Sequence, residues 1–296
     1  MKIVIAGGSG LIGRALAAAS LAAGDEVVVL SRHPAIGTPK TVVWDGMNSG
    51  SWQQALDGAT AVVNLVGESV AEGRWTAARK KQLVSSRINA TRTLVAALSV
   101  AKERPKVFVS GSAVGYYGDR GDETLDEAAK PGADFLAKLC QDWEREAVVA
   151  EPLGIRTVLL RTGVVLSKDG GALSKMLPIF KTGFGGPLGS GRQWMPWIAI
   201  EDIVGLIRHA IVSTASGPLN GVAPEPATNA EFSRALGHAL SRPAFLPAPA
   251  FVLRLALGEM SSMLLGGQKV VPKKALDLGY AFKQPKLEPA LRSILG

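Results

Sequence analysis

The sequence has few residues that could form covalent or metal cross-links, since it contains one cysteine and three histidines among 296 residues. A single cysteine, Cys140, excludes an internal disulfide and is typical of a reducing compartment, so we expect a cytoplasmic protein. The histidines lack acidic or thiol companions at ligand spacing, and we therefore expect no metal site. They are His33, His209 and His238.

Long hydrophobic runs are also absent. No apolar run approaches the roughly 20 residues that a membrane-spanning helix requires. The apolar start at residues 3–6 is too short for a signal peptide and ends at glycines, so we expect no membrane partner. With 47% hydrophobic residues the chain can still bury a large core.

Acidic residues are outnumbered, with 25 Asp and Glu against 33 Lys and Arg, which gives a net charge of +8. The basic residues crowd two segments, residues 74–92 and 269–274, without interleaved aromatics or a recognition motif for nucleic acid. We interpret them as a solvated helix face that also attracts a polyanionic cofactor, and we expect no nucleic-acid partner.

Strand and helix patterns alternate along the first two thirds of the chain, with the clearest helical pattern over residues 75–100. Such alternation predicts an α/β fold, a Rossmann-type doubly wound parallel sheet. Six apolar segments are predicted to be its strands: residues 2–6, 26–30, 41–44, 61–66, 106–110 and 156–161.

The texture of the sequence changes after residue 161. Residues 167–193 contain too many glycines for a regular element, so we expect a loop that shapes a cleft. A helix is predicted over 200–212, and the chain from Pro224 onward is expected to be mainly helical. We therefore divide the chain into a cofactor-binding domain, 1–222, and a small capping domain, 223–296.

The most informative motif is a glycine-rich turn between an apolar strand and an alanine-rich helix. Gly7 permits a tight exit from the strand, Gly10 lets a pyrophosphate approach the backbone, and Gly13 lets the helix press against the sheet. The positive end of the helix dipole then faces the anion. The residues expected to hold the pyrophosphate are Ser9, Gly10, Leu11 and Ile12.

The end of the second predicted strand indicates which cofactor binds. An NAD site usually places an acid there for the ribose hydroxyls, but this chain has Ser31 and Arg32. Arg32 offers a charged planar fork that suits a 2′-phosphate, and Ser31 can add a hydroxyl donor. The sequence therefore predicts NADP(H) rather than NAD(H).

Several motifs resemble the extended short-chain dehydrogenase/reductase superfamily, namely the glycine turn and the segments 64–68 and 110–118. The segments 185–191 and 267–272 resemble, more narrowly, its YfcH-type subgroup, known as the epimerase family. The resemblance implies an NADP(H)-binding Rossmann domain with a C-terminal domain over a cleft. It also implies cofactor contacts from Leu65, Val66, Gly67, Glu68 and Arg87, although Arg87 is equally well explained as a surface charge on a helix.

Catalysis in that superfamily rests on a Ser and a Tyr-x-x-x-Lys pair. Ser112 stands at the serine position and Lys138 at the lysine position, where it would also bind the nicotinamide ribose, but Asp134 replaces the tyrosine. An ionised carboxylate cannot donate a proton at neutral pH. Three interpretations follow: Tyr116 or Tyr117 replaces the phenol, Asp134 acts as a base beside Lys138, or the cofactor binds without turnover.

We therefore expect an NADP(H)-binding oxidoreductase or epimerase-like protein that acts on a small polar substrate in the cleft. The alternative is a catalytically silent, NADP(H)-dependent regulatory or interaction protein. The sequence does not identify the substrate.

Overall fold

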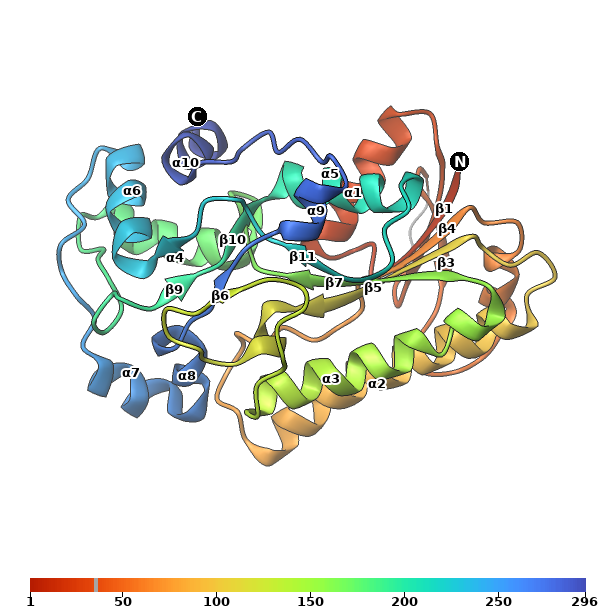
Figure 1. Ribbon diagram of the computed structural model, residues 1–296, viewed down its shortest axis with the longest axis horizontal. Helices are drawn as coiled ribbons and strands as arrows, with labels where there is room; N and C mark the ends of the chain where they lie inside the picture. Colours follow the sequence, from red (N-terminus) through yellow and green to blue (C-terminus); the bar gives the residue numbers. More distant parts are fainter. Residues whose placement is uncertain (35–36) are drawn as a thin grey trace.

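A computed structural model describes residues 1–34 and 37–296, and its centre is a seven-stranded parallel sheet (Figure 1). The strand order is β11-β7-β5-β4-β1-β2-β3, with parallel pairing throughout. The predicted α/β fold and its six strands are confirmed. The strands are β1 (Lys2–Ala6), β2 (Glu26–Ser31), β3 (Lys40–Val43), β4 (Ala61–Asn64), β5 (Val107–Ala113), β7 (Arg156–Thr162) and β11 (Gly217–Gly221).

Two helical layers cover the sheet, one on each face (Figure 1). On one face α1 (Leu11–Ala22) and α5 (Ile200–Val212) pack a cluster of buried aliphatic side chains against the strands. On the other face α2 (Ala77–Val100) and α3 (Phe135–Val148) do the same. The strands are thus apolar on both sides, as expected for a parallel sheet covered by helices.

A third apolar cluster lies beyond β7, at the left end of the molecule in Figure 1. It includes Leu173, Phe232 and Leu291, from three helices that are far apart in the sequence. Two small sheets join this layer to the rest. Its elements are β8 (Val164–Ser167), α4 (Gly171–Lys181), β9 (Trp194–Met195), β10 (Trp197–Ala199), β12 (Ala227–Thr228), α6 (Asn229–Leu240) and α10 (Leu287–Leu295).

The prediction of a loop over residues 167–193 is wrong in its first half, which contains α4. The glycines of this segment lie at the ends of the helix: Gly170 and Gly171 begin it, and the others follow from residue 183 onward. The stretch between them contains no glycine, so it can form a helix and bury Leu173 and Phe180.

The chain from Pro224 onward, which includes α6 and α10, is mainly helical, as predicted. Between α6 and α10 the chain first forms a surface helix, and then β13 pairs with β6 in a separate two-stranded parallel sheet. No helix within the described residues is long and apolar enough to cross a membrane. The remaining elements are β6 (Thr124–Leu125), α7 (Ala250–Leu257), α8 (Ser261–Leu265), β13 (Lys269–Val270), α9 (Lys273–Asp277) and the 3-10 helices η1 (Ser51–Leu56), η2 (Val114–Tyr117), η3 (Glu151–Leu153) and η4 (Gly258–Met260).

Candidate active site

The strand order reverses between β1 and β4, because β1 pairs with β2 on one side and with β4 on the other. In open α/β sheets ligands bind at the carboxyl ends of the strands beside such a switch point. Here Gly7 follows β1 and Leu65 follows β4. A Cβ atom on Gly7 would lie 2.8 Å from the Leu65 carbonyl carbon, and its φ is +80°. Glycine is therefore required at position 7 both for conformation and for closeness.

The helix after this turn presents its amino end without side-chain caps. Gly10 is the N-cap residue of α1 and supplies no side-chain acceptor, and the first turn contains no acidic residue. A Cβ atom on Gly13 would overlap the Gly7 carbonyl oxygen, so this glycine lets α1 press against the turn. The Gly10 N–H donates to the Gly7 carbonyl at 3.0 Å, and the N–H groups of Ser9, Leu11 and Ile12 lie at a helix start that fits a phosphate group.

Arg32 and Glu68 meet above the ends of β2 and β4. The Arg32 side chain is 70% exposed and its Nη1 lies 3.6 Å from Glu68 Oε1, while Arg79 lies 3.6 Å from the other Glu68 oxygen. Ser31 is buried, and its Oγ accepts a hydrogen bond from the His33 N–H at 3.3 Å. A long, exposed ion pair is weak, so Arg32 can turn toward an arriving anion.

Arg87 is held inside the protein and is not a solvated surface charge. Its Nη2 donates to the Glu68 carbonyl at 2.8 Å and its Nη1 to the Leu83 carbonyl at 3.1 Å. The guanidinium lies over the Trp143 ring, and burial lowers its pKa. Its contacts support the segment 65–68 from α2, so the structure gives Arg87 a positioning role for that segment.

Ser112 lies at the end of β5 and contacts a buried ion pair. Its Oγ donates to Glu144 Oε1 at 2.6 Å. Arg161, from β7, donates to both Glu144 oxygens at 2.8 Å in a two-pronged arrangement. All three side chains are buried. Burial by itself lowers the pKa of Arg161, but the hydrogen bond and the charge of Glu144 outweigh it and raise that pKa.

The two adjacent tyrosines differ in their environment. Tyr117 is fully buried, donates to Asn220 Oδ1 at 2.7 Å and accepts from Arg161 Nη1 at 3.1 Å. Burial raises its pKa to about 12. Tyr116 is half-buried, and the Arg161 guanidinium carbon lies 3.4 Å from the centre of its ring. Ser112, Tyr116 and Tyr117 are thus brought together around one arginine.

Asp134 and Lys138 are placed differently. Asp134 is the N-cap residue of α3 and accepts a hydrogen bond from the Ala137 N–H at 2.8 Å. Lys138 is exposed on the same helix. At about 100° per residue it points roughly 120° away from the face that carries Glu144 toward Ser112. The structure therefore does not bring Lys138 to the face of α3 that meets Ser112.

Glu144, Arg161 and Asn220 belong to the site but were not predicted from the sequence. A sequence signal existed for Arg161, because it directly follows the apolar run 158–160 within a predicted strand, and a charge buried there requires a partner. Glu144 lies 17 residues earlier in the chain and carried no comparable signal. Asn220 lies on β11 and accepts the hydrogen bond from Tyr117. The backbone N–H of Asn220 also donates to Glu127 Oε1 at 3.0 Å, so Glu127 joins the same hydrogen-bond network.

Comparison with known proteins places these motifs in a family. Residues 3–222 match the model of the NAD dependent epimerase/dehydratase family, and residues 248–294 match a domain of unknown function, DUF1731. The epimerase family protein SDR39U1 of Bos taurus is 42% identical over 301 residues, covering 100% of both chains. YfhF of Bacillus subtilis is 38% identical over 299 residues, covering 100% of this chain and 98% of YfhF. The crystal structure of human SDR39U1 (isoform 2) with NADPH superimposes with a TM-score of 0.92 at 38% identity, covering 99% of each chain.

Proposed function

Because the chain belongs to the NAD dependent epimerase/dehydratase family, and within it to the SDR39U1/YfhF type, we propose that it binds NADP(H) and acts on a small polar substrate as an oxidoreductase or epimerase. The observation that carries this proposal is the meeting of the glycine turn with the segment after β4 at the switch point, beside Arg32. The human relative was crystallised with NADPH, which supports the same cofactor here.

The residues present fit this cofactor. The uncapped start of α1 suits its pyrophosphate, and the exposed Arg32 suits its 2′-phosphate. On binding, the 2′-phosphate would take the place that Glu68 holds beside Arg32. The contacts assigned to the cofactor are Gly7, Ser9, Gly10, Leu11, Ile12 and Gly13 for the pyrophosphate, Ser31 and Arg32 for the 2′-phosphate, and Leu65, Val66, Gly67 and Glu68 for the adenosine and ribose.

When bound, NADP(H) supplies or accepts a hydride, and the protein must then move a proton. We assign this proton to Tyr116. The hydroxyl of Tyr117 already donates to Asn220 and its pKa is raised, so it is poorly suited to proton transfer. The guanidinium of Arg161 on the Tyr116 ring stabilises negative charge that develops as the phenol loses its proton.

Ser112 is proposed to bind the substrate by accepting a hydrogen bond at its hydroxyl oxygen. Its proton is directed to Glu144 Oε1, and the Arg161 fork donates to both Glu144 oxygens, so the Ser112 oxygen is left to accept a hydrogen bond from a ligand. It therefore selects a substrate with a hydroxyl or amine at this point, which is a polar substrate.

The second candidate function is a protein that binds NADP(H) without turnover. The engagement of Asp134 as a helix cap and the outward position of Lys138 favour it, because neither residue then replaces the Tyr-Lys pair. In this case the cofactor would set the conformation of the protein, which would act as a sensor.

The two functions are separated by following nicotinamide absorbance across aldehydes, ketones, quinones and sugar nucleotides. On a substrate found this way, Tyr116→Phe is expected to lower kcat by about 10² or more, as for a group that transfers a proton. Tyr117→Phe is the matched control and should leave kcat within about threefold. Equal losses in both variants would contradict the assignment of Tyr116, and NADPH binding without any turnover would favour the sensor.

A further inference from the structure

One helix of the C-terminal region lies on the surface with its apolar side chains outward. α7 contains no buried residue, and Phe251 and Leu255 are 71% and 77% exposed. Phe245, in the segment before α7, is 70% exposed. Phe184 and Ile179, near the end of α4, are also exposed. Large apolar side chains clustered on a surface are typical of an interaction site.

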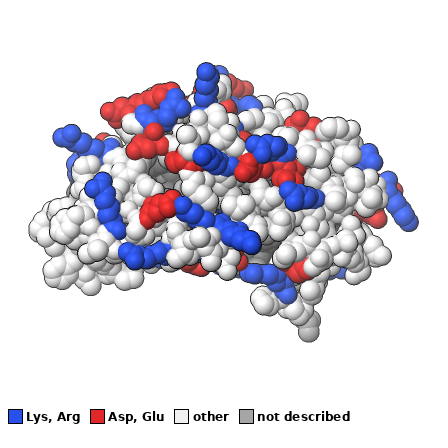
Figure 2. Space-filling view, turned by 90° about the horizontal axis from the view of Figure 1, so that it is seen from below, with Lys and Arg blue, Asp and Glu red and all other residues white. Residues whose placement is uncertain are grey.

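Two segments at this end of the molecule contain no acidic residue, while Glu231 and Glu259 border them in the sequence and Glu288 lies 3.9 Å from His238. Residues 170–193 and 232–258, which we call the acid-free end, lack Asp and Glu entirely. The two segments are in contact, since Arg242 Nε donates to the Lys181 carbonyl at 3.1 Å. In Figure 2 the left end of the molecule is mostly white and blue. The cations of this end are Lys175, Lys181, Arg192, Arg234, Arg242 and Arg254, all exposed.

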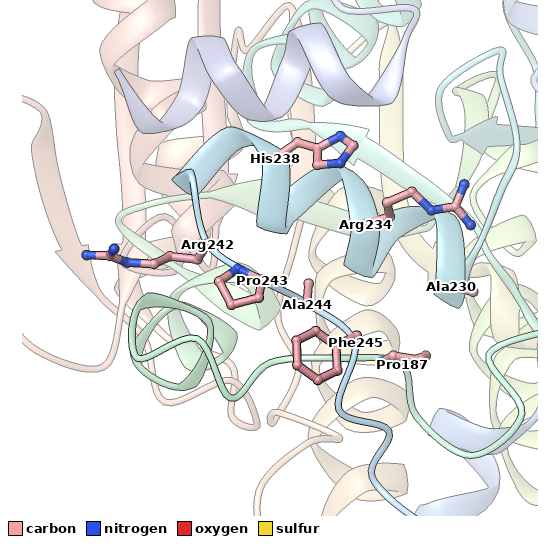
Figure 3. A pocket seen from close by; sticks show the side chains of 8 residues that line it. All are labelled: Pro187, Ala230, Arg234, His238, Arg242, Pro243, Ala244 and Phe245. Carbon is pink, nitrogen blue, oxygen red and sulfur yellow. The ribbon is translucent and has the colours of Figure 1, made fainter.

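A shallow cavity of about 340 Å³ opens within the acid-free end. Figure 3 shows Arg234 and His238 on α6 at one side of it and Phe245 and Pro187 at the other, while Arg242 points away. The carboxylate nearest to His238 is Glu288, 3.9 Å from its Nδ1, and Glu288 is itself paired with Arg292. The cavity combines a cation with an apolar wall and is the size of a small ligand.

We propose that the acid-free end docks on an anionic membrane surface, with the exposed Phe and Leu side chains in the interface and the Lys and Arg side chains on lipid phosphates. Apolar tips flanked by cations are the composition of interfacial membrane-binding surfaces. The sequence-based expectation of no membrane partner rested on the lack of a spanning run, which does not bear on surface docking.

A second copy of this chain fits the surface less well. A two-fold interface places the same patch on both subunits, so the cations of one copy would face those of the other with no carboxylate from residues 170–193 or 232–258 to pair with them. The exposed apolar side chains come from α4, the loop after it, the segment before α7 and α7 itself. Because they are spread over several elements, with only Phe245 of them lining the described cavity, a planar lipid surface matches them better than one acidic protein.

Cosedimentation tests the proposal with vesicles of phosphatidylcholine alone and with added phosphatidylglycerol. We expect the full chain to pellet with the anionic vesicles only, and the double variant Phe251→Ser, Leu255→Ser to bind them at least about tenfold more weakly. Val212→Ser removes a side chain that is 66% exposed outside the acid-free end, and this control should bind like the native protein.

A second set of variants in the same vesicle-binding experiment reverses the charge of single side chains. Arg234→Glu should weaken binding to anionic vesicles about tenfold, whereas Lys81→Glu, the same charge change on α2, should have little effect. Equal binding to neutral and anionic vesicles, or no binding to either, would overturn the proposal. A dimer in solution that the double variant dissociates, without vesicle binding, would assign this end to self-association. Capture of an acidic protein by the same residues, again without vesicle binding, would also overturn it.

Discussion

The side of the candidate site around β1 and β4 is built from backbone, whereas the side around β5 and β7 is built from buried charged side chains. On the first side a glycine turn meets a neighbouring segment, and Arg32 is held only by a loose contact with Glu68 at 3.6 Å. On the second side Glu144 accepts three hydrogen bonds of 2.6 to 2.8 Å from side chains that are themselves buried.

The difference fits the proposed function, in which one side receives the cofactor and the other moves a proton. A cofactor brings its own negative charge, so the side that receives it needs free N–H groups and a cation that can move. Proton transfer needs groups that are already oriented before the ligand arrives. We call the side around β5 and β7 the rigid side and the side around β1 and β4 the open side. Substitutions on the rigid side should therefore lower the stability of the fold, and substitutions on the open side should lower the affinity for NADP(H).

The largest expected effect is on stability. Glu144→Leu leaves Arg161 buried without its partner, so the free energy of unfolding should fall by about 3 to 5 kcal/mol. Urea denaturation measures it. Glu146→Leu is the matched control on the same helix, because Glu146 pairs with the exposed Arg92 and should contribute less than about 1 kcal/mol. Similar losses in both variants would remove the distinction between the two sides.

Adding a methyl group at Gly13, in the glycine turn, should weaken NADPH binding on the open side. Gly13→Ala places a carbon against the Gly7 carbonyl, which pushes α1 away and should destabilise the fold by about 1 to 3 kcal/mol and abolish most NADPH binding. Gly50→Ala is the control, since its new carbon would meet only Trp52 side-chain atoms at 3.5 Å or more. Calorimetric titration of both folded variants checks this expectation. NADPH binding by Gly13→Ala at native affinity would refute it.

Tyr117 gives the rigid side a pH dependence. The unfolded chain releases the phenolic proton near the ordinary pKa of 10.0, but the folded protein keeps it until about 12. The free energy of unfolding should therefore fall as the pH rises from 10 to 12, and this contribution is fully present below pH 10. Urea denaturation of Tyr117→Phe over this range should show a shallower fall than that of Tyr116→Phe. Identical slopes would count against the buried position of Tyr117.

The open side could be predicted from the sequence because its signals are local. Gly7, Gly10 and Gly13 lie within one strand-turn-helix unit, and Arg32 directly follows the next strand. On the rigid side Ser112, Tyr116 and Tyr117 were candidates through the family resemblance, but the network around them could not be predicted, because its members lie on separate elements: Ser112 on β5, Glu144 on α3 and Arg161 on β7. No spacing rule connects residues that meet only after the strands have been ordered in the sheet.

Two further errors have local causes. The seventh strand, β11, was missed because its sequence Gly-Pro-Leu-Asn-Gly contains residues that usually interrupt strands. It lies at the edge of the sheet and pairs only with β7, which explains why it tolerates Pro218. In contrast, α4 was missed because the density of flanking glycines hid a glycine-free stretch between them.

The smallest expected effect tests the central claim, that the open side binds NADP(H) through its 2′-phosphate. Calorimetric titration of the native protein should give a Kd for NADPH at least about tenfold below that for NADH, a difference of roughly 1.4 kcal/mol. Arg32→Ala should remove most of this difference and leave the Kd for NADH nearly unchanged. Lys40→Ala, an exposed lysine at the start of β3, is the charge-matched control and should keep the preference. Equal affinities for NADPH and NADH in the native protein would contradict the account.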